Sequence, residues 1–317
     1  MKKKILITGG TGFLGINLAK QLKKKYKIFL GARNNKQNFA ASKKTGCEVI
    51  PLDVTNINSI RDAINFSEPN IIIHAAATKF VDLSEKYPFE CVDANVFGST
   101  NVARAAIDKK VDSVIGISTD KASPPVKNIY GLSKAMMEKV FISADKNYKT
   151  NFVCVRYGNV AWSTGSVLPL WYEMFSKNKI IYTTGPNMRR FFFTVDEAVK
   201  LVITAMNNIK LFRGKVLSRE MKSSLIIDIL KTWIRMYGGK YKIGKKRPGE
   251  RIDEYLIGQT ELEFTKKIKI GGIIHYVIDF SKKAKKPLQN IVSSSNANKL
   301  SQKDIEHLIR LNKNYLT

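Results

Sequence analysis

The sequence predicts an α/β protein in which a Rossmann-like, doubly wound parallel sheet carries a smaller α/β lobe. Short, almost entirely apolar runs recur along the first half of the chain, at residues 5–7, 28–30, 49–52, 71–73 and 114–117. Each run is separated from the next by a segment long enough for a helix. Strands that are apolar on both faces are typical of a parallel sheet covered by helices. A glycine-rich turn follows the first run, and polar residues follow several of the others.

The first run leads into a glycine-rich turn at residues 8–15 and then into a helical pattern at residues 16–22. In such a unit, Gly9 allows a tight turn, Gly12 lets a pyrophosphate approach the backbone, and Gly15 lets the helix pack closely on the sheet. The spacing fits one glycine pattern that starts at Gly9 and another that starts at Gly10, and the sequence does not choose between them. The turn is therefore predicted to bind a dinucleotide, through Gly9, Thr11, Gly12, Phe13, Leu14 and Gly15.

The ends of the next strands supply further candidate cofactor contacts, because ligands of such sheets bind beyond the carboxyl ends of the strands. After the second run the chain has Arg33, Asn34 and Lys36 and no acidic residue. A basic residue there suits a ribose 2′-phosphate, whereas an acidic one accepts from a 2′-hydroxyl. We therefore predict NADP as the cofactor, with NAD as the alternative. The candidate contacts after the third and fourth runs are Asp53, Val54, Ala75, Ala76 and Ala77.

The fifth run leads into the segment that predicts the chemistry. Tyr130 and Lys134 lie one helical turn apart, so the ammonium can lower the phenol pKa and Tyr130 can take a proton from a substrate hydroxyl. Asp120 and Lys121 can act as an acid and a base if burial shifts both pKa values toward neutrality, or they can form a plain ion pair. The candidate catalytic residues are Thr119, Asp120, Lys121, Tyr130 and Lys134. Tyr130 and Lys134 are also candidate cofactor contacts, since Lys134 can anchor the nicotinamide ribose.

Several motifs together resemble a known family. Residues 8–15, 74–77 and the Tyr130–Lys134 pair are similar to the extended short-chain dehydrogenase/reductases that remodel nucleotide sugars. Residues 118–122, 156–160, 188–194 and 247–251 resemble, more narrowly, the inverting UDP-N-acetylglucosamine 4,6-dehydratases of the polysaccharide biosynthesis group. The resemblance runs along nearly the whole chain.

This resemblance implies a reaction and a set of roles. It implies conversion of UDP-N-acetylglucosamine to UDP-2-acetamido-2,6-dideoxy-4-keto-hexose with inversion at C5, through C4 oxidation, loss of water across C5 and C6, and hydride return to C6. Lys121 is then the base that removes the C5 proton, and Asp120 is the acid that protonates the leaving C6 hydroxyl. Asn95, which is also a candidate cofactor contact, resembles an Asn that stabilises a kink in the active-site helix. The candidate substrate-binding residues are Lys79, Asn159, Arg190, Arg247 and Glu250.

The chain also departs from the family pattern. The loop between Asp120 and Tyr130 is one residue longer and contains Pro124-Pro125, which stiffens its path. The departures at expected substrate contacts are Phe80, Trp162, Thr164 and Asp253. We therefore expect the chemical machinery to be kept and the sugar pocket to be altered.

Composition sets further expectations. Residues 1–160 are expected to form the NADP-binding Rossmann core, with segments around 188–206 returning to it, and residues 161–317 mainly a discontinuous substrate-binding lobe. The three cysteines show no metal-ligand spacing, and no secretory leader or apolar run of spanning length occurs. We expect a cytoplasmic protein with no metal and no membrane insertion. The net charge of +28 comes from scattered lysines, so no nucleic-acid partner is expected.

Alternative functions stay open at this point. A nucleotide-sugar 4-epimerase, or a retaining 4,6-dehydratase acting on UDP-glucose, would share most of these residues. The epimerase, however, would not need the Asp120–Lys121 pair. A non-enzymatic alternative is a Rossmann protein that senses NADP or binds RNA. We also expect a homo-oligomer, from dimer to hexamer, with an interface formed by helices around residues 88–110 and 128–147.

Overall fold

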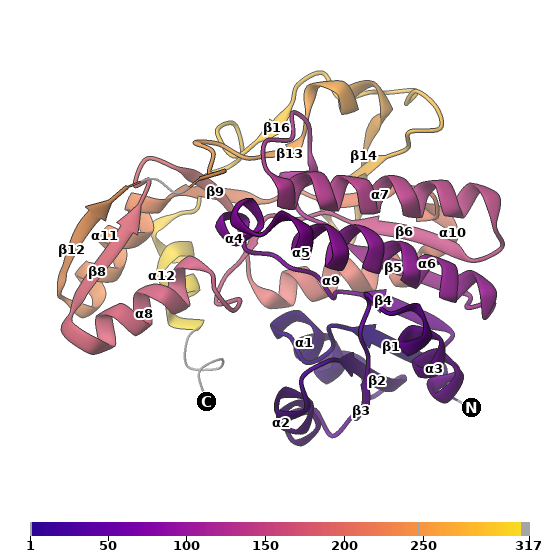
Figure 1. Ribbon diagram of the computed structural model, residues 1–317. Coiled ribbons are helices and arrows are strands. Elements are labelled where there is room, and N and C mark those ends of the chain that lie inside the picture. The colour runs from indigo at the N-terminus through magenta and orange to yellow at the C-terminus, as the bar shows by residue number, and fades with distance from the viewer. Residues whose placement is uncertain (1, 246–247, 312–317) are drawn as a thin grey trace.

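The computed structural model describes residues 2–245 and 248–311, and its centre is a nine-stranded sheet (Figure 1). The strand order is β14-β15-β10-β6-β5-β4-β1-β2-β3. The strands from β3 to β10 are parallel, and β15 and β14 add an antiparallel hairpin at one edge. In chain order the strands are β1 (Lys4–Thr8), β2 (Lys27–Ala32), β3 (Glu48–Pro51), β4 (Ile71–His74), β5 (Ser113–Ile117), β6 (Asn151–Val155), β10 (Val216–Arg219), β14 (Thr265–Ile270) and β15 (Ile273–Ile278).

Helices cover both faces of this sheet, which explains why its strands are apolar throughout. Ile5, Leu6 and Ile7 of β1 are fully buried. On one face α6 contacts α3 and α7, and on the other α1 contacts α2 and α9. These helices are α1 (Phe13–Leu22), α2 (Asn35–Thr45), α3 (Ile57–Ser67), α6 (Gly98–Asp108), α7 (Ile129–Asn147) and α9 (Val195–Asn207). Shorter elements are α4 (Val81–Lys86), α5 (Pro88–Val92), the π-helical turn η1 (Asp93–Phe97) and α10 (Ile209–Phe212). The predicted doubly wound α/β fold is confirmed.

A smaller lobe lies to one side of the sheet, at the left of Figure 1. It contains a three-stranded sheet of order β11-β9-β7 and the pair β12-β8, while the pair β13-β16 lies nearer the top centre of the figure. Its elements, with two 3₁₀ turns nearby, are η2 (Asp120–Ala122), β7 (Asn159–Val160), α8 (Val167–Asn178), β8 (Ile180–Thr184), β9 (Arg189–Phe193), β11 (Lys222–Leu225), α11 (Ile226–Tyr237), β12 (Lys240–Gly244), β13 (Tyr255–Ile257), η3 (Gln259–Phe264), β16 (Val292–Ser293) and α12 (Gln302–Arg310). Strands β10, β14 and β15 belong to the large sheet although the sequence assigned their residues mainly to the lobe.

The lobe has its own hydrophobic core, separate from that of the sheet. Trp233 of α11 contacts both Trp162 and Trp171. Helix α12 adds the buried side chains of Ile305 and Leu308. Two cores joined along one edge leave a seam between them, where a cleft can form.

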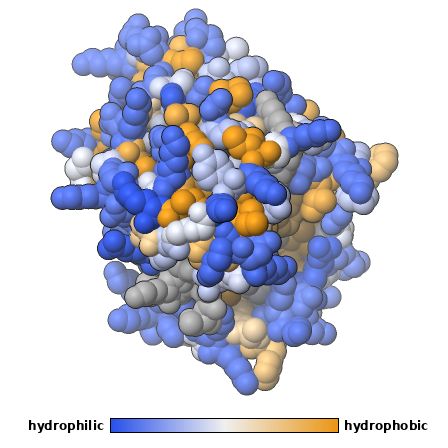
Figure 2. Space-filling view, turned by 90° about the vertical axis from the view of Figure 1, so that its left-hand side faces the viewer, coloured by the Kyte–Doolittle hydropathy of each residue, from blue (hydrophilic) through white to orange (hydrophobic). Residues whose placement is uncertain are grey.

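The surface of the lobe is mostly hydrophilic. Figure 2 shows this face with small, separated hydrophobic patches among polar side chains. Within the ranges that the structure describes, no helix combines the length and the apolar composition needed to cross a bilayer.

Candidate functional site

A cleft of about 780 Å³ lies between the sheet and the lobe. It is bordered by the glycine-rich turn, by the segments that follow β2, β4 and β5, by α7 and by residues of the lobe. This is the carboxyl-terminal edge of the parallel strands, where folds of this type bind ligands.

The glycine-rich turn forms one wall of the cleft. Gly9 has φ +66°, and a Cβ there would lie 2.7 Å from the backbone nitrogen of Ala76. A Cβ at Gly15 would lie 2.5 Å from the carbonyl oxygen of Gly10. Helix α1 starts after Gly12 with no side-chain cap, so its amino end presents backbone donors suited to a phosphate. All six predicted residues of the turn line the cleft, whereas Gly10 packs against Leu30, so the pattern that starts at Gly9 describes the site.

The segments after β2 and β3 form the far end of the cleft. Arg33 and Asn34 line it. The Asn34 side chain accepts a hydrogen bond from the Gln37 backbone and caps α2. Asp53 lies beside the cleft, with one carboxylate oxygen 4.0 Å from Arg33 Nη1 and the other bound to Thr55. Of the other candidates here, Val54 lines the cleft and Lys36 does not, while Gln37, which the sequence did not single out, does.

The segment after β4 carries the three predicted alanines. Ala75, Ala76 and Ala77 line the cleft. Asn95 is fully buried behind them, in the π-helical turn. Its side-chain oxygen accepts a hydrogen bond from the Thr78 N–H, and its side-chain nitrogen donates to the Thr78 carbonyl and to the Ser133 hydroxyl. Asn95 therefore joins the cleft wall to α7 rather than facing the cleft.

Tyr130 and Lys134 both line the cleft from α7, whose first turn is capped by Asn128. Burial raises the pKa of Tyr130 to about 12, while the charge of Lys121 and a hydrogen bond from Thr119 act in the opposite direction. Burial lowers the pKa of Lys134 to about 8. The sequence analysis expected this effect from Lys134, and the structure adds Lys121 as a cation that lowers the pKa of Tyr130.

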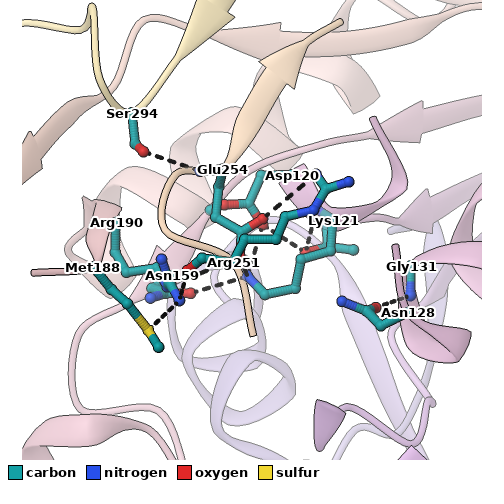
Figure 3. Close-up of polar contacts among 12 residues, drawn as sticks. Asp120, Lys121, Asn128, Gly131, Asn159, Met188, Arg190, Arg251, Glu254 and Ser294 are labelled. Atoms are coloured by element: carbon teal, nitrogen blue, oxygen red, sulfur yellow. Dashed lines mark hydrogen bonds and ion pairs between the residues drawn. The ribbon is translucent and has the colours of Figure 1, made fainter. Parts of the chain in front are cut away.

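Asp120 and Lys121 form a buried ion pair (Figure 3). Lys121 lines the cleft, whereas Asp120 is fully buried and does not line it. Lys121 Nζ lies 3.0 Å from Asp120 Oδ1 and 3.5 Å from both Glu254 Oε1 and Asn159 Oδ1. Burial, the largest single influence, lowers the pKa of Lys121, but the two carboxylates together raise it above its ordinary value. Of the two possibilities that the sequence left open, the structure has the ion pair, and a second carboxylate from a distant segment joins it.

Glu254 belongs to this charge cluster and was missed by the sequence analysis. It is 2% exposed and lines the cleft. Arg190 Nε lies 3.9 Å from its Oε1, and Arg251 Nη1 lies 4.0 Å from its Oε2. Nothing in the local pattern distinguishes Glu254 from the other charged residues near it. Its role becomes visible when the fold brings it to Lys121.

The remaining predicted substrate contacts also reach the cleft where the structure describes them. Lys79, Asn159, Arg190 and Glu250 line it, and burial lowers the pKa of Lys79. Arg190 donates to the backbone carbonyls of residues 189, 251 and 252, which fixes its guanidinium in place. Arg247 lies outside the described residues.

A buried ion network supports the segment that carries Asp120 and Lys121. Arg156, 1% exposed, donates to Glu138 on α7 and to Glu261 in η3. Glu138 accepts from Ser118 Oγ at 2.5 Å, and Glu261 accepts from Ser123 Oγ at 3.0 Å. The network thereby holds the segment on both sides of the reactive pair.

The residues that depart from the expected pattern lie in or behind the walls of the cleft. Trp162 has φ +62°, a conformation that favours glycine, and its indole nitrogen donates to the carbonyl of Leu308. Phe80 and Thr164 line the cleft, and the Phe80 ring packs on Gly165. Asp253 lies outside the cleft lining and accepts from Ser294 Oγ.

Comparison with known proteins adds to this geometry. The family model described as polysaccharide biosynthesis protein matches residues 5–275. The inverting UDP-N-acetylglucosamine 4,6-dehydratase of Campylobacter jejuni is 33% identical over 83% of this chain and 80% of its own length. A UDP-glucose 4-epimerase of Rickettsia bellii is 33% identical over 99% of this chain and 97% of its own. The crystal structure of Pen from Bacillus thuringiensis superposes with a TM-score of 0.90, at 29% identity, covering 100% of this chain and 99% of that one.

Proposed function

Because the chain belongs to the polysaccharide biosynthesis protein family, among nucleotide-sugar dehydratases and epimerases, we propose that it is an NADP-dependent UDP-N-acetylglucosamine 4,6-dehydratase that inverts C5. The observation that carries this proposal is the buried Asp120–Lys121 pair, 3.0 Å apart, whose lysine lines the same cleft as Tyr130 and Lys134. A 4-epimerase needs the tyrosine and a cofactor but has no step for a second acid and base. Membership in an enzyme family removes the support for a purely sensing or RNA-binding role.

The residues at the other end of the cleft fit a nicotinamide dinucleotide. The turn at Gly9, Gly12 and Gly15 leaves no room for a Cβ at two of these positions, and the uncapped start of α1 suits a pyrophosphate. Arg33 lines the cleft where a ribose 2′-phosphate would lie, which favours NADP over NAD. Lys134 would bind the nicotinamide ribose. When bound, the nicotinamide takes up a hydride and later gives it back.

Tyr130 is proposed to take the proton of the C4 hydroxyl, with Thr119 hydrogen-bonding the same oxygen. Because the phenol pKa is about 12 in the ligand-free protein, the cations of the complete site must lower it further before Tyr130 can act as a base near neutral pH. A carbonyl at C4 then makes the C5 proton acidic.

The Asp120–Lys121 pair can supply the acid and the base of the elimination together. Transfer of one proton from Lys121 Nζ to Asp120 Oδ1 breaks an N–H bond, forms an O–H bond and converts the ion pair into a neutral amine and a carboxylic acid. Lys121 then removes the C5 proton, and Asp120 protonates the C6 hydroxyl, which leaves as water. The elimination therefore restores the ion pair seen in the ligand-free protein.

The substrate's diphosphate is proposed to bind near Arg190, and Arg247 is proposed to contribute as well. A planar guanidinium suits bidentate binding of phosphate. Asn159 and Lys79 are proposed to contact the sugar or a phosphate, and Glu250 the uridine ribose.

The second candidate is a nucleotide-sugar 4-epimerase, favoured by similarity to the Rickettsia bellii protein along nearly the whole of both chains. Mass spectrometry of reactions with UDP-N-acetylglucosamine and UDP-glucose, each with NADP⁺ or NAD⁺, separates the two. A dehydratase yields a product lighter by one water, whereas an epimerase yields an isomer of unchanged mass. The Lys121→Ala variant should lose the dehydrated product while its first oxidation stays detectable. Normal dehydration by this variant would refute the role of Lys121.

We also propose that the protein is a homo-oligomer. The expected interface lies on the helices near residues 88–110 and 128–147, and large apolar side chains are exposed there: Phe89, Phe97, Leu132 and Met136. Such a cluster is typical of a surface that a partner covers.

A further inference from the structure

We propose that Glu254 is a positioning residue for the proposed base, because its carboxylate holds the Lys121 ammonium from the lobe while Asp120 holds it from the sheet. The effect of Glu254 on catalysis rests on the proposed function. The effect of Glu254 on the ionisation of Lys121, called the structural part below, rests on the geometry of the site alone.

The contacts of Lys121 come from three separate parts of the fold. Asp120 precedes it in the chain, Asn159 lies in β7, and Glu254 lies just before β13. A lysine has four rotatable side-chain bonds, so contact with its sequence neighbour alone leaves the ammonium several positions. A second carboxylate from another element limits the ammonium to one position.

Glu254 is itself fixed on both sides. Its backbone N–H donates to Ser294 Oγ, and its carbonyl accepts from the Ser294 N–H. Its carboxylate lies between the guanidinium groups of Arg190 and Arg251, at 3.9 and 4.0 Å. The carboxylate is therefore presented to Lys121 on a rigid support.

The same cluster contains buried polar atoms that no protein group satisfies. Asp120 Oδ2, Glu254 Oε2 and Arg251 Nη1 have no hydrogen-bond partner within the described part of the chain. Leaving such atoms buried is costly unless a ligand or a water meets them. Their presence around Lys121 supports the view that Glu254 belongs to the reacting site.

The charges that face Lys121 allow a directional prediction. Asp120 and Glu254 raise its pKa, Arg190 lowers it, and Tyr130 is close enough to interact with it. Glu254→Gln keeps the shape and the hydrogen-bonding oxygen but removes one of the two negative charges. The pKa of Lys121 should therefore fall.

The first test measures this pKa without any turnover. Competitive labelling of the ligand-free protein with acetic anhydride over a range of pH, read by peptide mass spectrometry, gives the pKa of Lys121. The expected result is a lower pKa in Glu254→Gln, an intermediate one in Glu254→Asp and no change in Glu263→Gln. Glu263 is the matched control, because it is an exposed glutamate paired with Lys283 outside the cleft. Equal values in Glu254→Gln and the parent would overturn the structural part.

The second test follows exchange of the substrate C5 proton in D₂O. Glu254→Gln should lower the plateau rate of exchange by about 10- to 100-fold, because the base is misplaced. In a plot of exchange rate against pH, the part of the curve that rises with pH should move to lower pH. Glu254→Asp should recover part of the rate. If the parent exchanges and Glu254→Gln exchanges equally fast with the same pH profile, the positioning role is wrong. If the parent shows no exchange with any UDP-sugar, the proposed function fails instead, and the labelling result still decides the structural part.

Discussion

Replacing Lys134 by Met is predicted to stabilise the ligand-free protein while weakening cofactor binding. Lys134 is 2% exposed, and its Nζ donates to Met137 Sδ, a weak acceptor, at 3.2 Å. A buried cation with so poor a partner is costly, and methionine has a similar length without the charge. We therefore expect the Lys134 charge to contribute to binding of the cofactor rather than to stability of the fold.

The magnitude follows from the pKa of Lys134, which burial lowers from 10.5 to about 8. A difference of two and a half units corresponds to about 3 kcal/mol at about 1.4 kcal/mol per unit. Because the folded pKa lies below the unfolded one, the protein carries this cost in full below about pH 8 and loses it progressively as the pH rises toward 10.5. Lys134→Met should therefore raise the free energy of unfolding by about 3 kcal/mol near pH 7.

Urea unfolding of the parent and Lys134→Met at about pH 7 and about pH 10 tests this reasoning. The stabilisation should be large at the lower pH and small at the higher one. Added NADP⁺ should stabilise the parent more than the variant. A variant no more stable than the parent near neutral pH would refute the argument, and an equal gain at both pH values would assign the effect to packing rather than to charge.

Three further predictions concern stability, cofactor choice and assembly. Arg156→Met should lower the free energy of unfolding in urea by about 3–5 kcal/mol, because it leaves two buried carboxylates unpaired. Arg61→Met, which breaks an exposed pair, should lower it by less than about 1 kcal/mol. Equal losses would contradict a structural role for the buried Arg156 network. Arg33→Asp should raise the KM for NADP⁺ about tenfold or more while leaving that for NAD⁺ nearly unchanged, and parallel changes would argue against a 2′-phosphate contact. Phe89→Asp should shift sedimentation toward a smaller species, whereas Phe66→Asp, at another exposed aromatic, should not; a parent that sediments as a monomer would end the oligomer proposal.

Local rules explain the parts of the site that the sequence predicted well. The glycine turn between β1 and α1 is readable because backbone conformation and close packing demand glycine at Gly9 and Gly15. The apolar runs became buried parallel strands because helices cover both faces. Tyr130 and Lys134 reach the cleft together because one helical turn separates them.

Long-range contacts explain what the sequence analysis missed. The charge on Lys121 depends on Glu254, which approaches it through the fold and not through the chain. The support of the reactive segment by Arg156 joins α7, β6 and η3, and no local pattern encodes that contact. The strained backbone of Trp162 likewise depends on packing against α12.

Proton NMR of the protein with UDP-N-acetylglucosamine and NADP⁺ in D₂O tests the central claim most directly. The account predicts a new C6 methyl signal, deuterium at C5 and the L-configuration of the 4-keto product. A spectrum in which the sugar is converted to its C4 epimer, with C5 and C6 intact, would contradict the dehydratase assignment and favour the epimerase.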